Sequence, residues 1–235
     1  MGELKGFLES FKEFIWDIVG YMLPGFYCII LLCFIVNNDC LENFNNVIVG
    51  NNGFFVWGVI IISYLLGYVI YSLGVFIEKK SGNKSYAKRI ANDVEKRSVY
   101  KIAKKKLEEM LEEQGVKEEA ENANIRDLRS IAMGLFPEQD QKIYTFQFRA
   151  DISNNAGIVS LIIGIIGLLC AIINLIPCAN VNFVIVDAIH VLLYIILIAI
   201  FFILKCMRNR FYAISLSLPF SLLCSSLVAD KQNHD

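Results

Sequence analysis

Two ionisable side chains, Asp187 and His190, lie three residues apart beside a long apolar stretch. Residues at that spacing share one face of a helix, so a carboxylate and an imidazole there could pair or exchange a proton. Ionisable groups at membrane depth are costly and are often functional. The pair is therefore a candidate pore lining or proton-sensitive site, and a hydrogen-bonded pair near the outer interface is the alternative. Asn174 is a candidate partner for either side chain.

The first apolar stretch holds further pore or gate candidates, Asp17, Pro24 and Gly25. Asp17 follows Trp16 at the inner end of the stretch, where it is either a functional carboxylate or an interface residue beside an aromatic anchor. The Pro24–Gly25 pair predicts a kinked or opened helix, because proline removes a backbone hydrogen bond. Such a kink serves packing or forms a gate.

Charged side chains cluster at the basic ends of the third and fourth apolar stretches. Arg149 and Asp151 precede the third stretch, and Arg208 and Arg210 follow the fourth. Antiparallel neighbours would bring both clusters to one depth, so we expect Asp151 to contact Arg208 or Arg210. This contact would be a structural clamp at the cytoplasmic mouth, or alternatively part of a gate or a ligand contact.

A basic run is followed by an acidic one. Residues 79–106 carry 11 basic and 2 acidic side chains, whereas residues 107–121 carry 7 acidic side chains and 1 basic. The basic run fits a solvated flank near anionic lipid, a helix paired with the acidic run of the same or a neighbouring subunit, or a surface that binds a nucleotide or nucleic acid. The candidate anion-binding residues are Lys84, Lys88, Arg89, Lys96, Arg97, Lys101, Lys104 and Lys105.

Signals of enzymatic chemistry are weak. The chain has 2 histidines and lacks zinc-ligand spacing, a phosphate-binding loop and the common nucleophile motifs. We expect no catalytic residue, no metal site and no cofactor. Of the 7 cysteines, only Cys40 and Cys178 fall in the predicted outer loops, where oxidising conditions would let them form a disulfide. Two reduced thiols are the alternative.

Long apolar helices must position these groups. The chain of 235 residues is 56% apolar and 19% charged, whereas a soluble domain has about 45–50% and about 25%. A crossing helix needs about 20 apolar residues, and the stretches that qualify are 14–36, 54–77, 158–176 and 183–204. The apolar stretch 211–228 contains Pro219 and several serines, so we expect it at the interface or packed on the inner side. A fifth crossing is the alternative.

Basic residues near the ends of the spans set the orientation. The loops 37–53 and 177–182 contain no Lys or Arg, whereas the other side is rich in both. We expect an all-α multi-pass membrane protein with four transmembrane helices, a helical cytoplasmic insert between the second and third, and both termini in the cytoplasm. The predicted segments are 1–78 (leader and first two crossings), 79–157 (insert), 158–205 (last two crossings) and 206–235 (cytoplasmic or interfacial).

The insert shows helical periodicity. Apolar residues recur at helical spacing across 86–114, and Gly115 follows as a stop signal. Asn124 predicts the cap of a second helix. A third helix is expected from Glu138 without a break into the third crossing.

Four crossings with few polar residues cannot enclose a wide aqueous path within one chain. Small residues such as Gly67, Gly74, Gly164 and Gly167 let helices approach closely in lipid, either within the chain or between subunits. Any conduction would therefore need a homo-oligomer with the path on its symmetry axis.

The layout as a whole resembles a known group of proteins. Two crossings, a charged helical insert, two further crossings, Pro24–Gly25 and the Arg-rich exit Arg208–Arg210 are similar to small membrane effectors of bacterial anti-phage defence, most of all the channel component of Hailong-type systems. The resemblance implies a homo-oligomeric ion channel that depolarises the host membrane. It also implies a partner nucleotidyltransferase that acts through a nucleic-acid oligomer, for which the basic run 79–106 is the natural site.

Two other function classes remain open from the residues alone. One is a non-conducting membrane anchor or scaffold that recruits a soluble partner through its helical insert. The other is a small transporter that uses Asp187 and His190.

Overall fold

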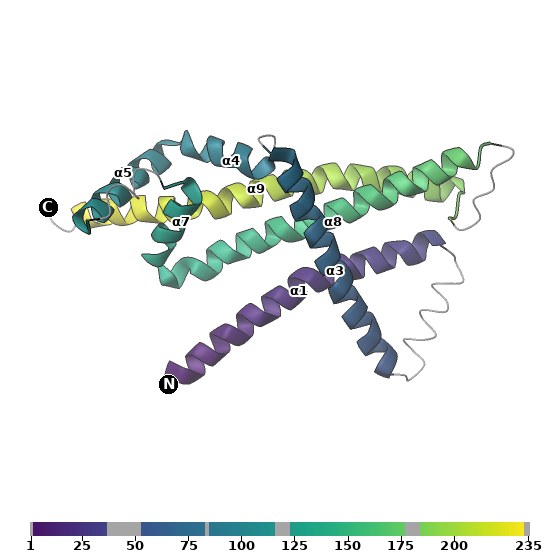
Figure 1. Ribbon diagram of the computed structural model, residues 1–235, viewed down its shortest axis with the longest axis horizontal. Helices are drawn as coiled ribbons and strands as arrows, with labels where there is room; N and C mark the ends of the chain where they lie inside the picture. Colours follow the sequence, from purple (N-terminus) through teal and green to yellow (C-terminus); the bar gives the residue numbers. More distant parts are fainter. Residues whose placement is uncertain (1, 37–52, 83–84, 116–122, 177–183, 233–235) are drawn as a thin grey trace. The chain divides into compact units, whose positions relative to one another are not determined.

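The structure is a computed structural model that describes residues 2–36, 53–82, 85–115, 123–176 and 184–232. Within these residues it contains seven α-helices and one short 3-10 helix, and no strand (Figure 1). The chain forms two compact units. The membrane unit comprises residues 1–77 and 151–207, and the insert unit comprises residues 78–150 and 208–235.

Four helices are long and apolar enough to cross a membrane, which confirms the predicted number of spans. They are α1 (Gly2–Val36), α3 (Gly53–Ser81), α8 (Asp140–Ile173) and α9 (Ala188–Gln232). A 3-10 turn, η2 (Pro137–Gln139), precedes α8, which then runs unbroken into the third span as predicted. The fourth helix begins five residues later than the predicted 183, because Asp187 forms its N-terminal cap.

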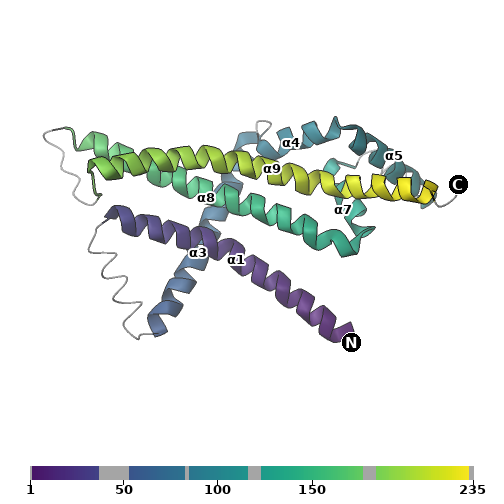
Figure 2. The ribbon, with the colours of Figure 1, turned by 180° about the vertical axis from the view of Figure 1, so that it is seen from behind.

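The backbones of α1 and α3 touch where the two helices cross (Figures 1 and 2). A Cβ atom on Gly67 would lie 1.7 Å from the Tyr21 carbonyl oxygen, and one on Gly25 would lie 1.8 Å from that of Ser63. No larger residue fits at these distances, so both glycines are required for this approach. Pro24 is buried at the same place, and α1 stays helical through it. The Pro24–Gly25 pair therefore serves packing and does not open the helix.

Aromatic rings surround the crossing of α1 and α3. The Tyr21 ring meets those of Tyr64, Tyr68 and Tyr71 edge to face, with centroids 5.8, 5.5 and 5.4 Å away. Edge-to-face pairs stabilise by about 0.5–1.5 kcal/mol beyond the area they bury. The tyrosines of α3 thus pack within the chain around a residue of α1.

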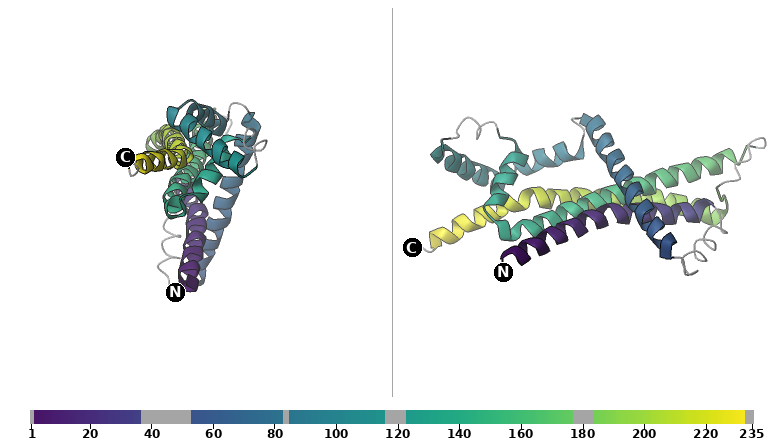
Figure 3. Two further views of the ribbon diagram at one scale, coloured as in Figure 1. Left: turned by 90° about the vertical axis from the view of Figure 1, so that its left-hand side faces the viewer. Right: turned by 60° about the horizontal axis from the view of Figure 1, so that its bottom comes forward.

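In the membrane unit, α8 and α9 pack antiparallel (Figure 3). Gly157 lies against Leu204, and further along α8 Gly164 and Gly167 lie against Tyr194. A Cβ atom on Gly167 would come within 2.4 Å of the Tyr194 ring, which is fully buried. The small residues of the third span therefore make the space that this ring fills.

The insert contains α4 (Tyr86–Glu95), α5 (Ser98–Glu113) and α7 (Ile125–Gly134). The prediction of one helix across 86–114 was wrong, because the chain breaks at 96–97. The buried stripe of α4 is Ala87, Ile90 and Val94, and an unbroken helix would continue it with Arg97 and Lys101. The break instead starts a new buried stripe on α5, made by Tyr100, Ala103 and Leu107.

Caps define the ends of the insert helices. The Asn124 side chain accepts hydrogen bonds from the backbone N–H groups of Arg126 and Asp127, and the Asp127 carboxylate accepts one from the Asn124 N–H. This reciprocal box confirms the predicted cap. Gly115 follows α5 with φ of +80°, a left-handed conformation that suits glycine and confirms the predicted stop.

The apolar stretch 211–228 is the C-terminal half of α9. Tyr212, Leu216, Phe220 and Leu223 are buried in one core with the inner faces of α4, α5 and α7. The Phe220 ring meets Tyr100 edge to face at 5.0 Å, and burial raises the pKa of Tyr100 to about 12. This stretch is neither a separate crossing nor a separate interfacial helix, because it continues α9 and its apolar face supplies the core of the insert unit.

The crossing of α1 and α3 gives a first test with a control on the same helix. Gly67→Leu forces the backbones of α1 and α3 apart, and we expect it to lower the free energy of unfolding by about 1–3 kcal/mol or more. A Cβ atom on Gly58 would have nothing within 4 Å, so Gly58→Leu should leave stability unchanged. Thermal denaturation in detergent, followed by size-exclusion chromatography, measures both. Equal melting temperatures for the two variants would contradict the crossing.

Candidate functional sites in the membrane and insert units

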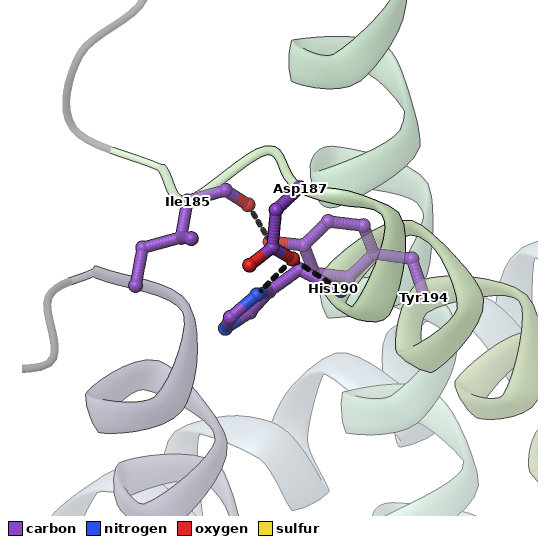
Figure 4. A network of polar contacts seen from close by, with 4 residues as sticks. All are labelled: Ile185, Asp187, His190 and Tyr194. Carbon is purple, nitrogen blue, oxygen red and sulfur yellow. Dashed lines mark hydrogen bonds and ion pairs between the residues drawn. The ribbon is translucent and has the colours of Figure 1, made fainter.

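The Asp187–His190 pair forms the N-terminal cap of α9 (Figure 4). The Asp187 carboxylate accepts a hydrogen bond from the His190 backbone N–H at 2.7 Å, and its Oδ1 lies 2.5 Å from His190 Nδ1. The hydrogen bond from the His190 N–H is the main reason why the pKa of Asp187 is below its usual value. The carboxylate is exposed, so its observed role is to satisfy backbone donors at a helix end.

The segment before α9 is held in place by two further hydrogen bonds. The Tyr194 hydroxyl donates to the Ile185 carbonyl at 2.8 Å (Figure 4). The Ile185 N–H donates to the carbonyl of Ile35, near the end of α1, at 2.9 Å. These bonds fix the position of Asp187. A pore-lining or proton-sensitive role for Asp187 and His190 stays a prediction, as does one for Asn174, which follows the end of α8.

Polar side chains on α8 form what we call the α8 seam: Asp151, Ser153, Asn154, Asn155 and Ser160. Ser153, Asn155 and Ser160 are buried. The Asn154 side-chain amide donates to the side-chain oxygen Oδ1 of Asn155 at 3.4 Å. A Cβ atom on Gly74 of α3 would lie 2.9 Å from Asn154 Nδ2, so glycine makes room for the amides between the two helices.

Ser160 ties α8 to α1. Its hydroxyl donates to the Ala156 carbonyl at 2.9 Å and lies 2.8 Å from the Tyr27 hydroxyl oxygen. Because the serine hydrogen is already used, Tyr27 is the donor in the second bond. Interhelical hydrogen bonds in membranes contribute about 0.6 kcal/mol on average. The buried hydroxyl of Ser160 is thus used in helix packing.

One polar group at the α1–α3 crossing is unsatisfied. Ser63 is fully buried, and its hydroxyl has no hydrogen-bond partner among the described residues. Its backbone carbonyl is the group that Gly25 approaches, so this point of α3 lies directly against α1. The buried polar groups of the membrane unit that the structure describes therefore lie at helix contacts, and they do not outline a path through these helices.

In the insert unit, Arg208 is held by several groups. Its guanidinium carbon lies 3.8 Å from the centroid of the Tyr86 ring, and its Nε and Nη2 atoms donate to Asn209 Oδ1 at 3.2 and 3.0 Å. The Tyr86 ring in turn meets Tyr212 edge to face. Glu78 supports the start of α4, since its Oε1 accepts a hydrogen bond from the Ala87 N–H at 3.1 Å.

The other arginines of the predicted clamp differ from Arg208. Arg149 lies over the rings of Phe146 and Phe211, at 5.7 and 5.9 Å from their centroids, and Arg210 is exposed. Asp151 belongs to the membrane unit, whereas Arg208 and Arg210 belong to the insert unit. The clamp between them stays a prediction.

The predicted anion-binding residues that the structure describes lie at the surface of the insert helices and of the break between α4 and α5. Lys104 is half-buried, and the exposed members are Lys88, Arg89, Lys96, Arg97, Lys101 and Lys105. Some of the basic charge is paired with acidic residues of the same helix, because Lys96 contacts Asp93, Lys104 contacts Glu108 and Lys106 contacts Glu109, each at 3.5 Å. The acidic run thus partly neutralises the basic run within the chain.

The charges of α5 oppose its own helix dipole. The first turn contains Lys101 and no acidic residue, and the last turn contains Glu112 and Glu113 and no basic residue. A helix favours the opposite arrangement by about 0.3–1 kcal/mol per charge near its ends at low salt. The charge pattern of α5 is therefore not explained by the stability of the isolated helix.

Some predictions concern groups outside the described residues. Cys40, Cys178 and Lys84 belong to this set, and so does the side chain of Asp17, although its backbone is part of α1. Among the residues that the structure describes, no three His, Cys, Asp or Glu side chains gather in a way that could hold a metal ion.

Sequence reasoning missed the contacts of Tyr27 with Ser160 and of Arg208 with Tyr86. Isolated hydroxyls in apolar stretches were the available signal for the first contact. The second joins residues more than 100 positions apart, and no spacing rule predicts it. No protein-family model, curated protein or solved structure matches this chain.

The contacts of Arg208 predict a difference between two neighbouring arginines. Arg208→Ala removes the cation–π contact with Tyr86 and the hydrogen bonds to Asn209, and we expect it to destabilise the protein by about 1–2 kcal/mol. Arg210→Ala removes the same charge from an exposed position and should have little effect. Limited proteolysis of both variants in membranes tests this. Cleavage within residues 86–136 that is equally fast in both would contradict the contacts of Arg208.

The cap at Asp187 predicts a pH-dependent contribution to stability. The pKa of Asp187 is lower in the folded protein than in the unfolded chain, so its contribution is present above the unfolded value of about 3.9 and is lost as the pH falls further. Asp187→Ala should therefore lower the melting temperature at pH 7 and lower it less at pH 3. Asp187→Asn is the control, because asparagine also caps helices. An Asp187→Ala effect that grows on acidification would argue against the cap.

Proposed function

We propose that this chain is a subunit of a homo-oligomeric ion channel, or of a related pore-forming effector, that is opened from the cytoplasmic side of the bacterial inner membrane. One observation carries the proposal. Three helices, α3, α8 and α9, each run without a break from the membrane unit into the insert unit. An α-helix is stiff, so a change in the insert helices can be passed to the spans as a shift of a whole element.

The packing of the membrane unit supports an assembly of several copies. Its buried polar groups join helices of the same chain, as Tyr27 and Ser160 do. Large apolar side chains on α3 and α9 are exposed in the single chain, among them Trp57, Val69, Ile189 and Ile203. These faces are available to lipid or to neighbouring copies. A conducting path would therefore lie at the centre of an oligomer.

The resemblance to anti-phage effectors extends the proposal to control of the channel. It suggests that a nucleotidyltransferase partner keeps the channel closed or opens it through a nucleic-acid oligomer. The exposed cations of α4 and of the break that follows it, such as Lys88, Arg89 and Arg97, are where an anionic oligomer would bind. Opening would depolarise the host membrane.

A non-conducting anchor is the second candidate function, and the core of the insert unit favours it. Helices α4, α5 and α7 bury a complete apolar face against α9, so they form a folded module that could recruit a soluble partner. In this case activity would reside in the partner. The small transporter is less well supported, because Asp187 caps a helix.

Ion flux separates the first two functions. Liposomes that contain the purified protein should lose an imposed potassium gradient when a short anionic oligonucleotide is added. Induced expression of the protein should depolarise bacteria. Gly67→Leu is the matched control, because it breaks the α1–α3 crossing and leaves the basic helices unchanged. A monomeric protein that is silent with and without oligonucleotide would exclude the channel and favour the anchor.

A further inference from the structure

The exposed face of α5 carries opposite charges at its two ends. Its buried stripe faces the core of the insert unit, and the opposite face is formed by Lys101, Ile102, Lys105, Glu109 and Glu112. The helix has four lysines in its first nine residues and four glutamates in its last six, so its net charge is zero. Within the described residues, Lys101 and Lys105 form no ion pair.

A uniformly charged partner does not fit this face. An anionic lipid surface or a nucleic acid would be attracted by the lysine end of α5 and repelled by the glutamate end, over a helix only about 24 Å long. A partner must therefore present the same charges in the reverse order. The chain itself contains that pattern, in a second copy of α5 that runs in the opposite direction.

We propose that α5 is a self-complementary contact between two copies of this chain, paired antiparallel about a two-fold axis at the level of Leu107. With this register Lys105 lies opposite Glu109 of the second copy, and Lys101 lies within about 1.5 Å of the level of Glu112. Each pair occurs twice, because a two-fold interface uses the same surface on both copies. Ile102, which is 55% exposed, adds an apolar side chain near each end of the contact.

The charge order that opposes the helix dipole is explained by this pairing. In an antiparallel pair, the acidic end of each helix lies beside the positive N-terminus of the other, so the dipoles of the two helices also attract. Exposed ion pairs are individually weak. The contact therefore rests on the oligomer of the proposed function, in which the spans hold the copies together and raise the effective concentration of one α5 near another.

Disulfide trapping in membranes tests the register. The chain with Ile102→Cys and the chain with Glu113→Cys, carrying different tags, are co-expressed and oxidised. The antiparallel register brings these two positions to within about 1.5 Å of the same level, so a mixed disulfide should form. Either variant expressed alone is the matched control for the native cysteines. Antiparallel pairing places the two copies of residue 102 about 15 Å apart along the helices, so Ile102→Cys alone should give no new adduct.

Charge reversal tests the complementarity. With Lys101→Glu and Lys105→Glu on both copies, the mixed disulfide should be lost. Adding Glu109→Lys and Glu112→Lys to the same chains should restore it, because the reversed helix is again self-complementary. The restored variant also matches the helix dipole better than the native helix does, so we expect α5 to fold in it. High salt should weaken the trap in the native background.

Three results would overturn the pairing. They are an Ile102→Cys adduct as strong as the mixed one, no mixed adduct in membranes that contain folded protein, and no recovery on double charge reversal. Ion flux is measured on the same samples. Flux without the mixed adduct would remove the α5 contact and leave the channel, whereas the adduct without flux would remove the channel and leave the contact.

Discussion

Close contact between helix backbones holds the membrane unit together. In lipid the hydrophobic effect does not drive helices against each other, so packing and a few hydrogen bonds must do so. The α1–α3 crossing depends on Gly25 and Gly67, whose would-be Cβ atoms lie 1.8 and 1.7 Å from the opposing carbonyl oxygens. The Tyr21 ring packs with tyrosines of α3 around this point. In the other helix pairs a glycine likewise makes room for a larger residue of the neighbouring helix. The spans therefore meet at a few fixed points, and much of their surface remains available for lipid or neighbouring copies.

The insert unit follows the rules of a soluble domain. Short amphipathic helices with capped ends bury one face each, and charged residues cover the other side. Its core is completed by α9, which enters it with Leu216 and Phe220. Removing residues 86–136 would therefore expose an apolar helix, and surface substitutions are the better way to study partner binding.

Much of the fold could be predicted from the sequence because its main constraints are local. The spans follow from the length of apolar stretches, and the Asn124 cap and the Gly115 stop follow from residue type. The break between α4 and α5 depends on which residues face the core, a tertiary constraint that periodicity within one stretch does not report. For the same reason the sequence did not show that 211–228 packs in the insert core, because the pattern of an apolar helix face is the same whether protein or lipid covers it. The spacing of Asp187 and His190 could not distinguish a helix cap from a pore lining, because side chains at positions i and i+3 fit both.

The continuity of α9 has a consequence for how the protein is made. At 1.5 Å per residue its 45 residues extend about 68 Å, more than twice the thickness of the hydrocarbon layer. One part of this helix must therefore lie in the hydrocarbon layer, and another part must pack against protein. The residues that cover Leu216 and Phe220 lie earlier in the chain, so they leave the ribosome first. The apolar C-terminal half of α9 is thus synthesised after the helices α4, α5 and α7 that cover it, so it can pack against them as soon as it emerges.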